Sequence, residues 1–320
     1  MANLNIFAGF DVSKGYFDVT ILGAENKPVS GRFRNNQEGF KEMMRVVPLG
    51  AHCIMEATGA YYLQLACWLH TEGFVVSVVN PLVIRRFAQS LLKRVKTDKA
   101  DAALIAHFGR MHQPSAWAPP AQYQVQLQQL QALREGAVTH LTALTNQLEA
   151  FSAGAMMNKQ TERLLRKRIQ QEQKHLLDVE AQIESIIEQY HPELLKNLSS
   201  IPGIAKKTAG VLITVTGGFS RFANYKQLCA YVGITPRIYE SGSSVKGKAR
   251  ISKIGMSRVR AMLYVCAWSA KRCNKSCKEL YDRLLAKGKA KRVAIIAVAH
   301  KLLRQAFAIA TSNKPYLIQP

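Results

Sequence analysis

The hydrophobic pattern of this chain changes its period once, near residues 117–122, and this change constrains the fold more than any other feature. Before it, apolar runs that alternate like strands are interspersed with helical patterns, which is typical of an α/β domain. After it, apolar residues recur at spacings of three and four along two long segments, which is typical of helices packed side by side. Because Pro119 and Pro120 stand at the change, we interpret it as a linker.

The N-terminal part carries the signals of several strands and helices. Strands are predicted at residues 5–11, 16–22, 32–34, 52–56 and 74–79, and helices at residues 37–47, 61–71, 83–93 and 100–111. Thr97 is suited to cap the last of these helices. Strands come first and then alternate with helices, an order that predicts a mixed sheet flanked by helices.

Two heptad-like stripes follow the linker and are broken near residues 152–158. The first stripe contains Leu141, Leu144, Leu148 and Phe151, and the second contains Ile169, Leu176, Val179, Ile183, Ile186 and Tyr190. The pattern predicts two long helices that form a coiled-coil segment. A hairpin within one chain and a hairpin that also joins two chains both satisfy it.

A third region begins after Pro192. Its segment LSSIPGIAKKTAGVLI predicts two helices joined by a tight turn at residues 201–204, which resembles a helix-hairpin-helix. The turn of that motif presents backbone N–H groups to a DNA phosphate. Ala205 stands where the second turn glycine is usual, so a role in packing alone remains open. The predicted domains are therefore residues 1–118, 119–192 and 193–320, the last mainly helical.

Positive charge dominates the chain and is concentrated near its C-terminal end. The net charge is +23, with 44 lysines and arginines against 21 acidic residues, which predicts a polyanionic partner and favours nucleic acid. Between residues 246 and 304 the only acidic residues are Glu279 and Asp282, too few to balance the basic ones as a salt-bridged surface would require. The predicted phosphate contacts are Gly203, Lys206, Lys207, Lys246, Lys248, Arg250, Lys253, Arg258 and Arg260.

The remaining composition points to the cytoplasm. The six cysteines are scattered, and Cys273 and Cys277 lie one helical turn apart rather than at zinc-knuckle spacing, so we expect free thiols in a reducing compartment. The N-terminus lacks the pattern of a signal peptide. No stretch reaches the length of about 18 uncharged apolar residues that a membrane span needs, so we expect no membrane partner.

Four carboxylates occupy positions that predict a metal site. Asp11 lies within an apolar strand, where an unpaired charge is costly, and Glu56 ends another. Asp98 and Asp101 are three residues apart and share one face of a helix. Each alone has an ordinary explanation, such as a strand-end turn or helix N-terminal stabilisation. Together they predict a Mg²⁺ site, and two ions about 4 Å apart would hold both the attacking and leaving phosphate oxygens.

An acidic residue on the first strand, another on the fourth and a third on a later helix form the RNase H-like order. The stretches GFDVSK, IMEATGAY, VVNP and KTDKADA resemble the DEDD-type insertion-sequence transposases, the family that includes the Piv DNA invertase. SIPGIAKKTAGVL, LCAYVGITPR and YESGSSVKGKARISKIG resemble that family's C-terminal domain, so the resemblance runs from about residue 6 to about residue 305. It implies a RuvC-like α/β N-terminal domain with Asp11, Glu56, Asp98 and Asp101 as the metal-binding tetrad.

The resemblance also implies a chemistry for Ser241, whose surroundings otherwise look like a polar turn. The serine would attack a DNA phosphate and form a phosphoserine intermediate. Ser243 and Ser244 are lesser candidates, and Lys246, Lys248 and Arg250 are suited to bind nearby phosphates. Implied partners are element-end and target DNA, a non-coding guide (bridge) RNA, and a second copy of the chain in a dimer or tetramer. Mn²⁺ is expected to substitute for Mg²⁺, and the implied place of action is the nucleoid of a prokaryotic cytoplasm.

Two other functions fit the same residues. One is a resolvase-like nuclease in which water attacks the phosphate and Ser241 is idle. The other is an architectural nucleic-acid-binding protein with an inactive carboxylate site. Replacing Asp11 separates an enzyme from a binder, and replacing Ser241 separates a recombinase from a nuclease.

Overall fold

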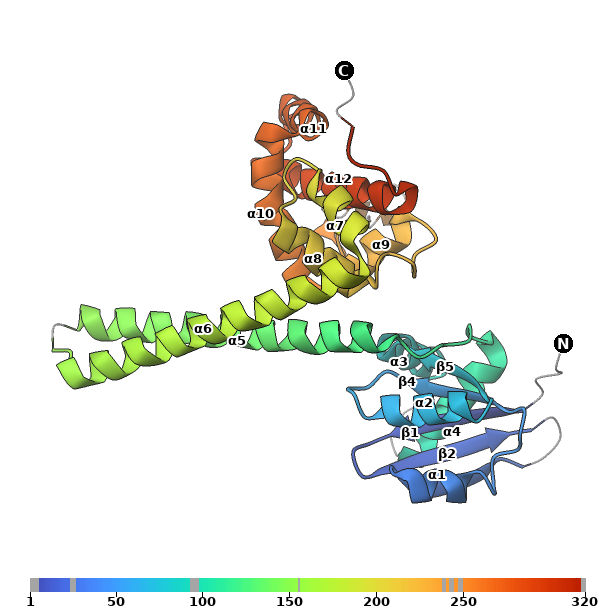
Figure 1. Cartoon of the computed structure of the whole chain (residues 1–320). Helices are drawn as coiled ribbons and strands as arrows, with labels where there is room; N and C mark the ends of the chain where they lie inside the picture. Colours follow the sequence, from blue (N-terminus) through green and yellow to red (C-terminus); the bar gives the residue numbers. More distant parts are fainter. Residues whose placement is uncertain are drawn as a thin grey trace. The chain divides into compact units, whose positions relative to one another are not determined.

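The computed structural model describes residues 6–23, 27–92, 98–154, 156–237, 240–241, 245–246 and 250–317. It divides the chain into two compact units, Met1–Pro120 and Ala121–Pro320, which Figure 1 shows in blue to green and in green to red. The division lies at the predicted linker. The helical segment predicted for residues 119–192 belongs with the C-terminal unit.

The first unit is built on a five-stranded mixed sheet of order β3-β2-β1-β4-β5. The strands are β1 (Phe7–Val12), β2 (Tyr16–Leu22), β3 (Val29–Arg34), β4 (His52–Glu56) and β5 (Val75–Val79). β1, β2 and β3 form an antiparallel meander, whereas β4 and β5 join β1 in parallel. The predicted mixed sheet is confirmed, and with the mostly helical remainder of the chain it fits an RNase H-like domain.

Helices cover both faces of this sheet (Figure 1). They are α1 (Gln37–Met43), α2 (Tyr62–Thr71), α3 (Pro81–Ser90) and α4 (Asp98–His112). Alternation along β1 sends Phe10 into the core shared with α1 and α2, and Phe7 into the core shared with α3 and α4. Asp11 follows the parity of Phe7 and therefore lies on the α4 face.

Glycines allow α4 to approach the sheet closely. A Cβ added to Gly9 of β1 would lie 2.2 Å from the backbone N of Ala106 and 2.3 Å from the backbone O of Ala102, both in α4. One added to Gly109 of α4 would lie 2.4 Å from the side chain of Ile54 in β4. The helix thus packs backbone against backbone on β1, which places its first turn near the end of that strand.

The predicted elements of this unit match the observed ones in type and order, with shifts at their ends. The third strand begins at Val29 rather than at residue 32, and the first helix ends at Met43 rather than at residue 47. The last helix begins at Asp98, so Asp98 and Asp101, two of the three aspartates of the predicted tetrad, belong to its first turn. Thr97, the predicted cap, lies outside the described residues.

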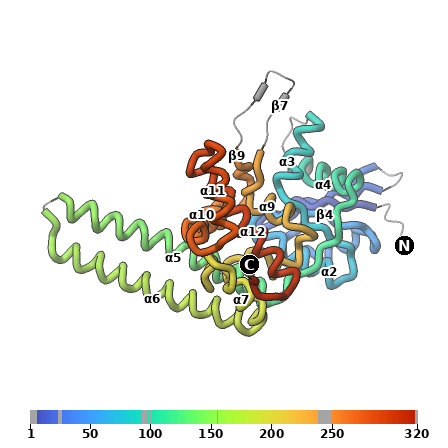
Figure 2. Tube along the Cα trace, turned by 90° about the horizontal axis from the view of Figure 1, so that it is seen from above, coloured from blue at the N-terminus to red at the C-terminus, as the bar shows by residue number. Residues whose placement is uncertain are grey.

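The C-terminal unit opens with two long helices, α5 (Gln122–Ala153) and α6 (Lys159–Tyr190). They lie side by side in both Figure 1 and Figure 2 and run in opposite directions. Near the base of the hairpin, Leu127, Leu130 and Ile183 are buried in the main core of the unit. Toward the loop the stripe is only half-buried, and Phe151 is 43% exposed. The hairpin is confirmed, whereas coiled-coil packing stays a prediction.

Six more helices and two short ribbons complete the described part of this unit. The helices are α7 (Pro192–Ser199), α8 (Lys206–Thr216), α9 (Tyr225–Val232), α10 (Ser257–Cys273), α11 (Lys275–Ala286) and α12 (Lys291–Ser312). β6 (Pro236–Arg237) pairs with β9 (Arg250–Ile251), and β7 (Glu240–Ser241) pairs with β8 (Val245–Lys246). α7 and α8 flank the predicted turn, although its DNA-binding role stays a prediction.

Among the described residues, helix α12 is long and apolar enough to cross a membrane by length and composition alone. It nevertheless carries Lys301 and Arg304. Its residues Val298, Leu302 and Ala306 are fully buried in the core of the unit. In this fold α12 is therefore a central core helix.

Candidate metal centre and serine loop

Polar residues form one row across the α4 face of the sheet. Asp11 of β1 is the cross-strand partner of Asp18 in β2, and Asp18 is the partner of Arg32 in β3. On the other side, Phe10 pairs in parallel with Met55, so Asp11 and Glu56 follow at the same edge. Residues paired directly across a sheet project to the same face. The row therefore reads Glu56, Asp11, Asp18, Arg32.

The first turn of α4 supplies the remaining carboxylates. Asp98 and Asp101 both lie in this turn, close enough that both raise the pKa of Asp11. Two strand ends and a helix start thus bring the four predicted tetrad residues together. The close packing of α4 on Gly9 is the structural cause.

Burial and the neighbouring like charges change the pKa of Asp11. The pKa of its carboxyl is raised to about 6, first by burial and then by the charges of Asp101, Asp98, Glu56 and Asp18 in that order. A carboxylate in such surroundings is destabilised in its charged form unless a cation is present. The residues present therefore fit a divalent metal, because carboxylate oxygens are the ligands that Mg²⁺ prefers.

The described side chains do not yet form a closed cage: no three acidic, histidine or cysteine groups among them are arranged to hold one ion. Asp98 accepts a 2.7 Å hydrogen bond from Arg32, and Glu56 accepts one from the hydroxyl of Thr58. The carboxylates are gathered around Asp11 without forming a coordination shell.

Arg32 and Asp18 are members of this site that sequence reasoning missed. The guanidinium of Arg32 holds Asp18 with two nitrogens, the shortest contact being 2.8 Å, and reaches Asp98 with the second of them. Asp18 was identifiable in principle, because a short turn after Val12 places it opposite Asp11. Arg32 was not, since its partner Asp98 lies far along the chain.

Ser241 lies in the second unit, in a short ribbon. Its backbone pairs with Val245, and Glu240 pairs with Lys246. The side chains of these strands are not described. Ser243, Ser244 and Lys248 lie outside the described residues.

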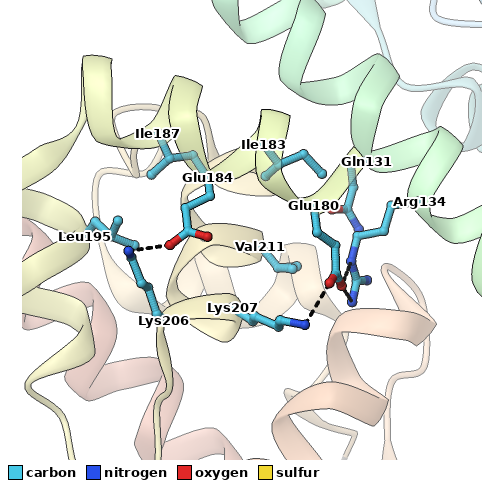
Figure 3. Close-up of a pocket in the computed structure, with 11 residues that line it drawn as sticks. Gln131, Arg134, Glu180, Ile183, Glu184, Ile187, Leu195, Lys206, Lys207 and Val211 are labelled. Atoms are coloured by element: carbon cyan, nitrogen blue, oxygen red, sulfur yellow. Dashed lines mark hydrogen bonds and ion pairs between the residues drawn. The ribbon is translucent and has the colours of Figure 1, made fainter. Parts of the chain in front are cut away.

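Several predicted phosphate contacts are already engaged within the unit. Figure 3 shows Lys206 beside Glu184 and Lys207 beside Glu180, on opposite sides of a cavity of about 250 Å³ between α5, α6 and α8. Lys206 also contacts Glu188 at 2.7 Å, and the Lys207–Glu180 distance is 2.7 Å. Arg134 completes the pair at Glu180 from α5. In this structure the charges of both lysines are balanced by α6.

The remaining predicted phosphate contacts differ in whether they already have a partner within the unit. Arg258 pairs with Glu135 at 2.9 Å, and Arg260 donates to the backbone carbonyl of Val232. A Cβ on Gly203 would lie 2.6 Å from that of Ala270, so this glycine permits close packing against α10. By contrast, Arg250 and Lys253, which follow the serine ribbon in the sequence, are exposed.

Comparison with known proteins matches both halves of the chain in order. Residues 195–282 match the profile described as "Transposase IS116/IS110/IS902 family", and residues 8–157 match the DEDD transposase profile of IS110 elements, described as "Transposase". The chain is 33% identical over 323 residues to the pilin gene-inverting protein of Moraxella lacunata, covering 97% of each chain. It is 32% identical to the protein of that name from Moraxella bovis, again over 97% of each. An uncharacterized 43.6 kDa protein of insertion element IS110 from Streptomyces coelicolor is 30% identical over 41% of this chain and 32% of its own length.

Proposed function

This chain belongs to the IS116/IS110/IS902 family of transposases and is a DNA transposase or recombinase, and from that premise we propose that it moves or inverts its own DNA element with a carboxylate-bound Mg²⁺ and a serine nucleophile. The observation that carries the proposal is the gathering of acidic side chains from two strand ends and the first turn of α4 around half-buried Asp11, which also raises the pKa of Asp11 by burial and by four other carboxylates. Such a cluster is costly in a free protein and is suited to a bound cation.

Asp11, Glu56, Asp98 and Asp101 would hold the metal. When bound, the metal would stabilise negative charge on the oxygens of the scissile phosphate. Asp11 and Glu56 are provided by rigid strand ends, and Asp98 and Asp101 by the first turn of a helix pressed against β1. We propose that Asp98 leaves Arg32 when it binds the metal.

Ser241 would supply the covalent step. Its hydroxyl oxygen forms a bond to phosphorus while one P–O bond of the DNA backbone breaks, and the departing oxygen takes up a proton. A DNA hydroxyl then attacks the phosphoserine, reforms a phosphodiester and releases the serine hydroxyl. Both steps are transesterifications and neither hydrolyses the phosphodiester, so the reaction can rejoin the strand that it cuts.

The partners follow from the family. DNA is the substrate that a transposase implies. We further propose a guide RNA transcribed from the element, two ions per site, and a homo-oligomer acting on nucleoid DNA in the cytoplasm. Because Ser241 and the carboxylates lie in separate units, an oligomer also offers a way to join the serine of one subunit with the carboxylates of another.

A covalent-trapping assay tests the proposal. Full-length protein, Mg²⁺, end-labelled element DNA and the element's RNA are mixed, denatured and separated on a gel. We expect a labelled protein–DNA adduct that disappears in Ser241→Ala and in Asp11→Asn, while Asp11→Asn retains DNA affinity. Cleavage without an adduct, unaffected by Ser241→Ala, would show that water is the nucleophile. DNA binding with no Mg²⁺-dependent cleavage would leave only an architectural role.

A further inference from the structure

A second cavity in the C-terminal unit is lined by cations. It has a volume of about 430 Å³ and lies between β6, β9, α11 and α12. Arg250, Arg283, Lys301 and Arg304 line it, with apolar residues such as Ile251 and Ile296 between them. We call this cavity with its four cations the cationic pocket. No aspartate or glutamate is among the described residues that line it.

Within the described part of the chain, no carboxylate balances the charges of the cationic pocket. Among the residues that the structure describes, none of its four cations forms a salt bridge with a carboxylate. Lys206, Lys207 and Arg258, in contrast, are all paired with glutamates of α5 or α6. Unpaired cations that converge on one concave site create a positive potential that attracts anions.

Two of the four cations are also held in place by contacts within the unit. The guanidinium of Arg304 lies over the ring of Tyr225 at 4.5 Å, and the ammonium of Lys301 donates a 2.8 Å hydrogen bond to the carbonyl of Ser276. Each cation keeps further N–H donors free for another acceptor. His300 also lines the pocket, and burial together with Arg304 lowers its pKa, so it stays neutral near pH 7. The pocket therefore presents N–H donors, two of whose side chains are held in place, among apolar lining residues.

Its position links it to the serine. Pro236 and Arg250 line the pocket and belong to the paired strands β6 and β9, which flank the segment that carries Ser241. A backbone of the length between Pro236 and Ser241 reaches at most about 18 Å. One strand of a duplex rises about 3.4 Å per nucleotide, so this reach corresponds to roughly five phosphates.

We propose that the cationic pocket receives a backbone phosphate of the nucleic acid on which Ser241 acts, within a few nucleotides of the attacked bond. Arginine forks match phosphate oxygens with two parallel hydrogen bonds, which distinguishes this site from a merely basic surface. The link to Ser241 rests on the proposed function, whereas phosphate binding in the pocket does not. We assign the phosphate to the DNA strand. A guide RNA offers the same chemistry, and the test separates the two.

The test compares two charge-matched double variants of the full-length protein. Arg283→Gln/Arg304→Gln removes two cations of the pocket, and Arg163→Gln/Lys174→Gln removes two exposed cations of α6 that form no salt bridge with a described residue. Affinity for a fluorescein-labelled DNA duplex, and separately for an RNA of equal length, is measured by anisotropy between about 50 and 200 mM salt. We expect the pocket variant to bind DNA about tenfold more weakly, with a salt slope lower by about one, and the α6 variant to change little.

Equal DNA affinity of the two variants would overturn the proposal, and a loss confined to RNA would reassign the phosphate to the guide. Arg283→Gln alone is an exposed change that leaves the Arg304–Tyr225 contact intact, so it tests the pocket even if the double variant unfolds. The result is distinguishable from a failure of the proposed function. If the wild-type protein forms no serine adduct, the proposed chemistry is refuted, but a loss of DNA affinity in the pocket variant would still support the pocket. If the adduct forms and the pocket variant binds DNA as tightly as the wild type, the chemistry stands and the pocket proposal is refuted.

Discussion

Asp11 occupies the point where the carboxylates of the first unit meet. It is half-buried at the end of β1, with Asp18 and Glu56 on neighbouring strands and the first turn of α4 above it. Because the folded protein buries this group and holds it among like charges, its pKa is raised to about 6. The folded state of the metal-free protein therefore binds a proton more tightly than the unfolded chain does.

This linkage sets the direction of a stability change with pH. Above about pH 6 Asp11 is ionised in both states, and its charge disfavours the fold. In chelator at pH 7.5, Asp11→Asn is expected to raise the free energy of unfolding by about 1 kcal/mol, a figure reduced for the partial exposure of the carboxyl. Well below pH 4 the gain should vanish, because the carboxyl is then neutral in both the native and the unfolded state. Urea unfolding at both pH values, with the exposed Asp178→Asn as control, measures it. A gain that persists well below pH 4 would contradict the electrostatic cause.

A second prediction at the scale of single residues concerns Arg32. It is the cation that Asp18 and Asp98 contact in the described structure, and a divalent ion would compete with it for Asp98. Arg32→Gln should therefore tighten Mn²⁺ binding about fivefold, the effect of removing one charge several ångströms from a divalent ion. Electron paramagnetic resonance of free Mn²⁺ gives the affinity without requiring activity. Weaker binding in Arg32→Gln would mean instead that Arg32 positions Asp98 for the metal.

At the scale of elements, the contact between α4 and β1 controls whether the tetrad assembles. The helix approaches so closely that its backbone lies where a side chain at Gly9 would stand. In the second unit a helix contact neutralises charge instead. Helix α6 presents Glu180, Glu184 and Glu188 along one face, and these glutamates pair with the lysines in the first turn of α8. The α4–β1 contact brings the carboxylates together, and the α6–α8 contact neutralises two lysines.

Gly9→Ala tests the first of these contacts. The new methyl group would meet the backbone of Ala102 and Ala106, which cannot move without shifting the helix. We expect a loss of about 2–3 kcal/mol in the free energy of unfolding, together with weaker Mn²⁺ binding. Gly15→Ala is the matched control in the neighbouring turn, where an added Cβ meets nothing within 4 Å. A Gly9→Ala protein as stable as Gly15→Ala would refute this close packing.

At the scale of the whole molecule, chemistry is divided between two units. The carboxylates belong to the first unit and the serine ribbon to the second, in which the α5–α6 hairpin extends from the core. If the proposed serine acts on a phosphate bound at another subunit's metal site, cutting depends on assembly. This arrangement would prevent a lone subunit from breaking DNA that it cannot rejoin.

Mixing two inactive variants tests the arrangement. Asp11→Asn lacks a carboxylate and Ser241→Ala lacks the nucleophile, so each should be inactive alone. If sites are shared between subunits, the mixed oligomer contains one intact site and should form the DNA adduct again. If each site lies within one subunit, no mixture regains activity. The adduct assay on co-purified variants, with each variant alone as control, distinguishes these outcomes.

Much of the fold could be predicted because it depends on local patterns. Alternation of apolar residues located every strand of the sheet, and spacings of three and four located the long helices, since these periods reflect backbone geometry. The convergence of Asp11, Glu56, Asp98 and Asp101 was predicted from strand ends and a helix start and is seen in the shared electrostatics of Asp11. Element ends were shifted by a few residues, as at Val29, because tertiary pairing extends a strand beyond its local signal.

Which charges remain free was decided only by the tertiary structure. The composition predicted a basic surface, yet Lys206, Lys207 and Arg258 are neutralised by glutamates from distant helices. Arg283 and Arg304 carried no sequence signal of their own and come together only because α11 and α12 pack around one cavity. Arg32 reaches Asp98 for the same kind of reason. Periodicity is a property of the chain, whereas the pairing of two charges depends on a distance that only folding sets.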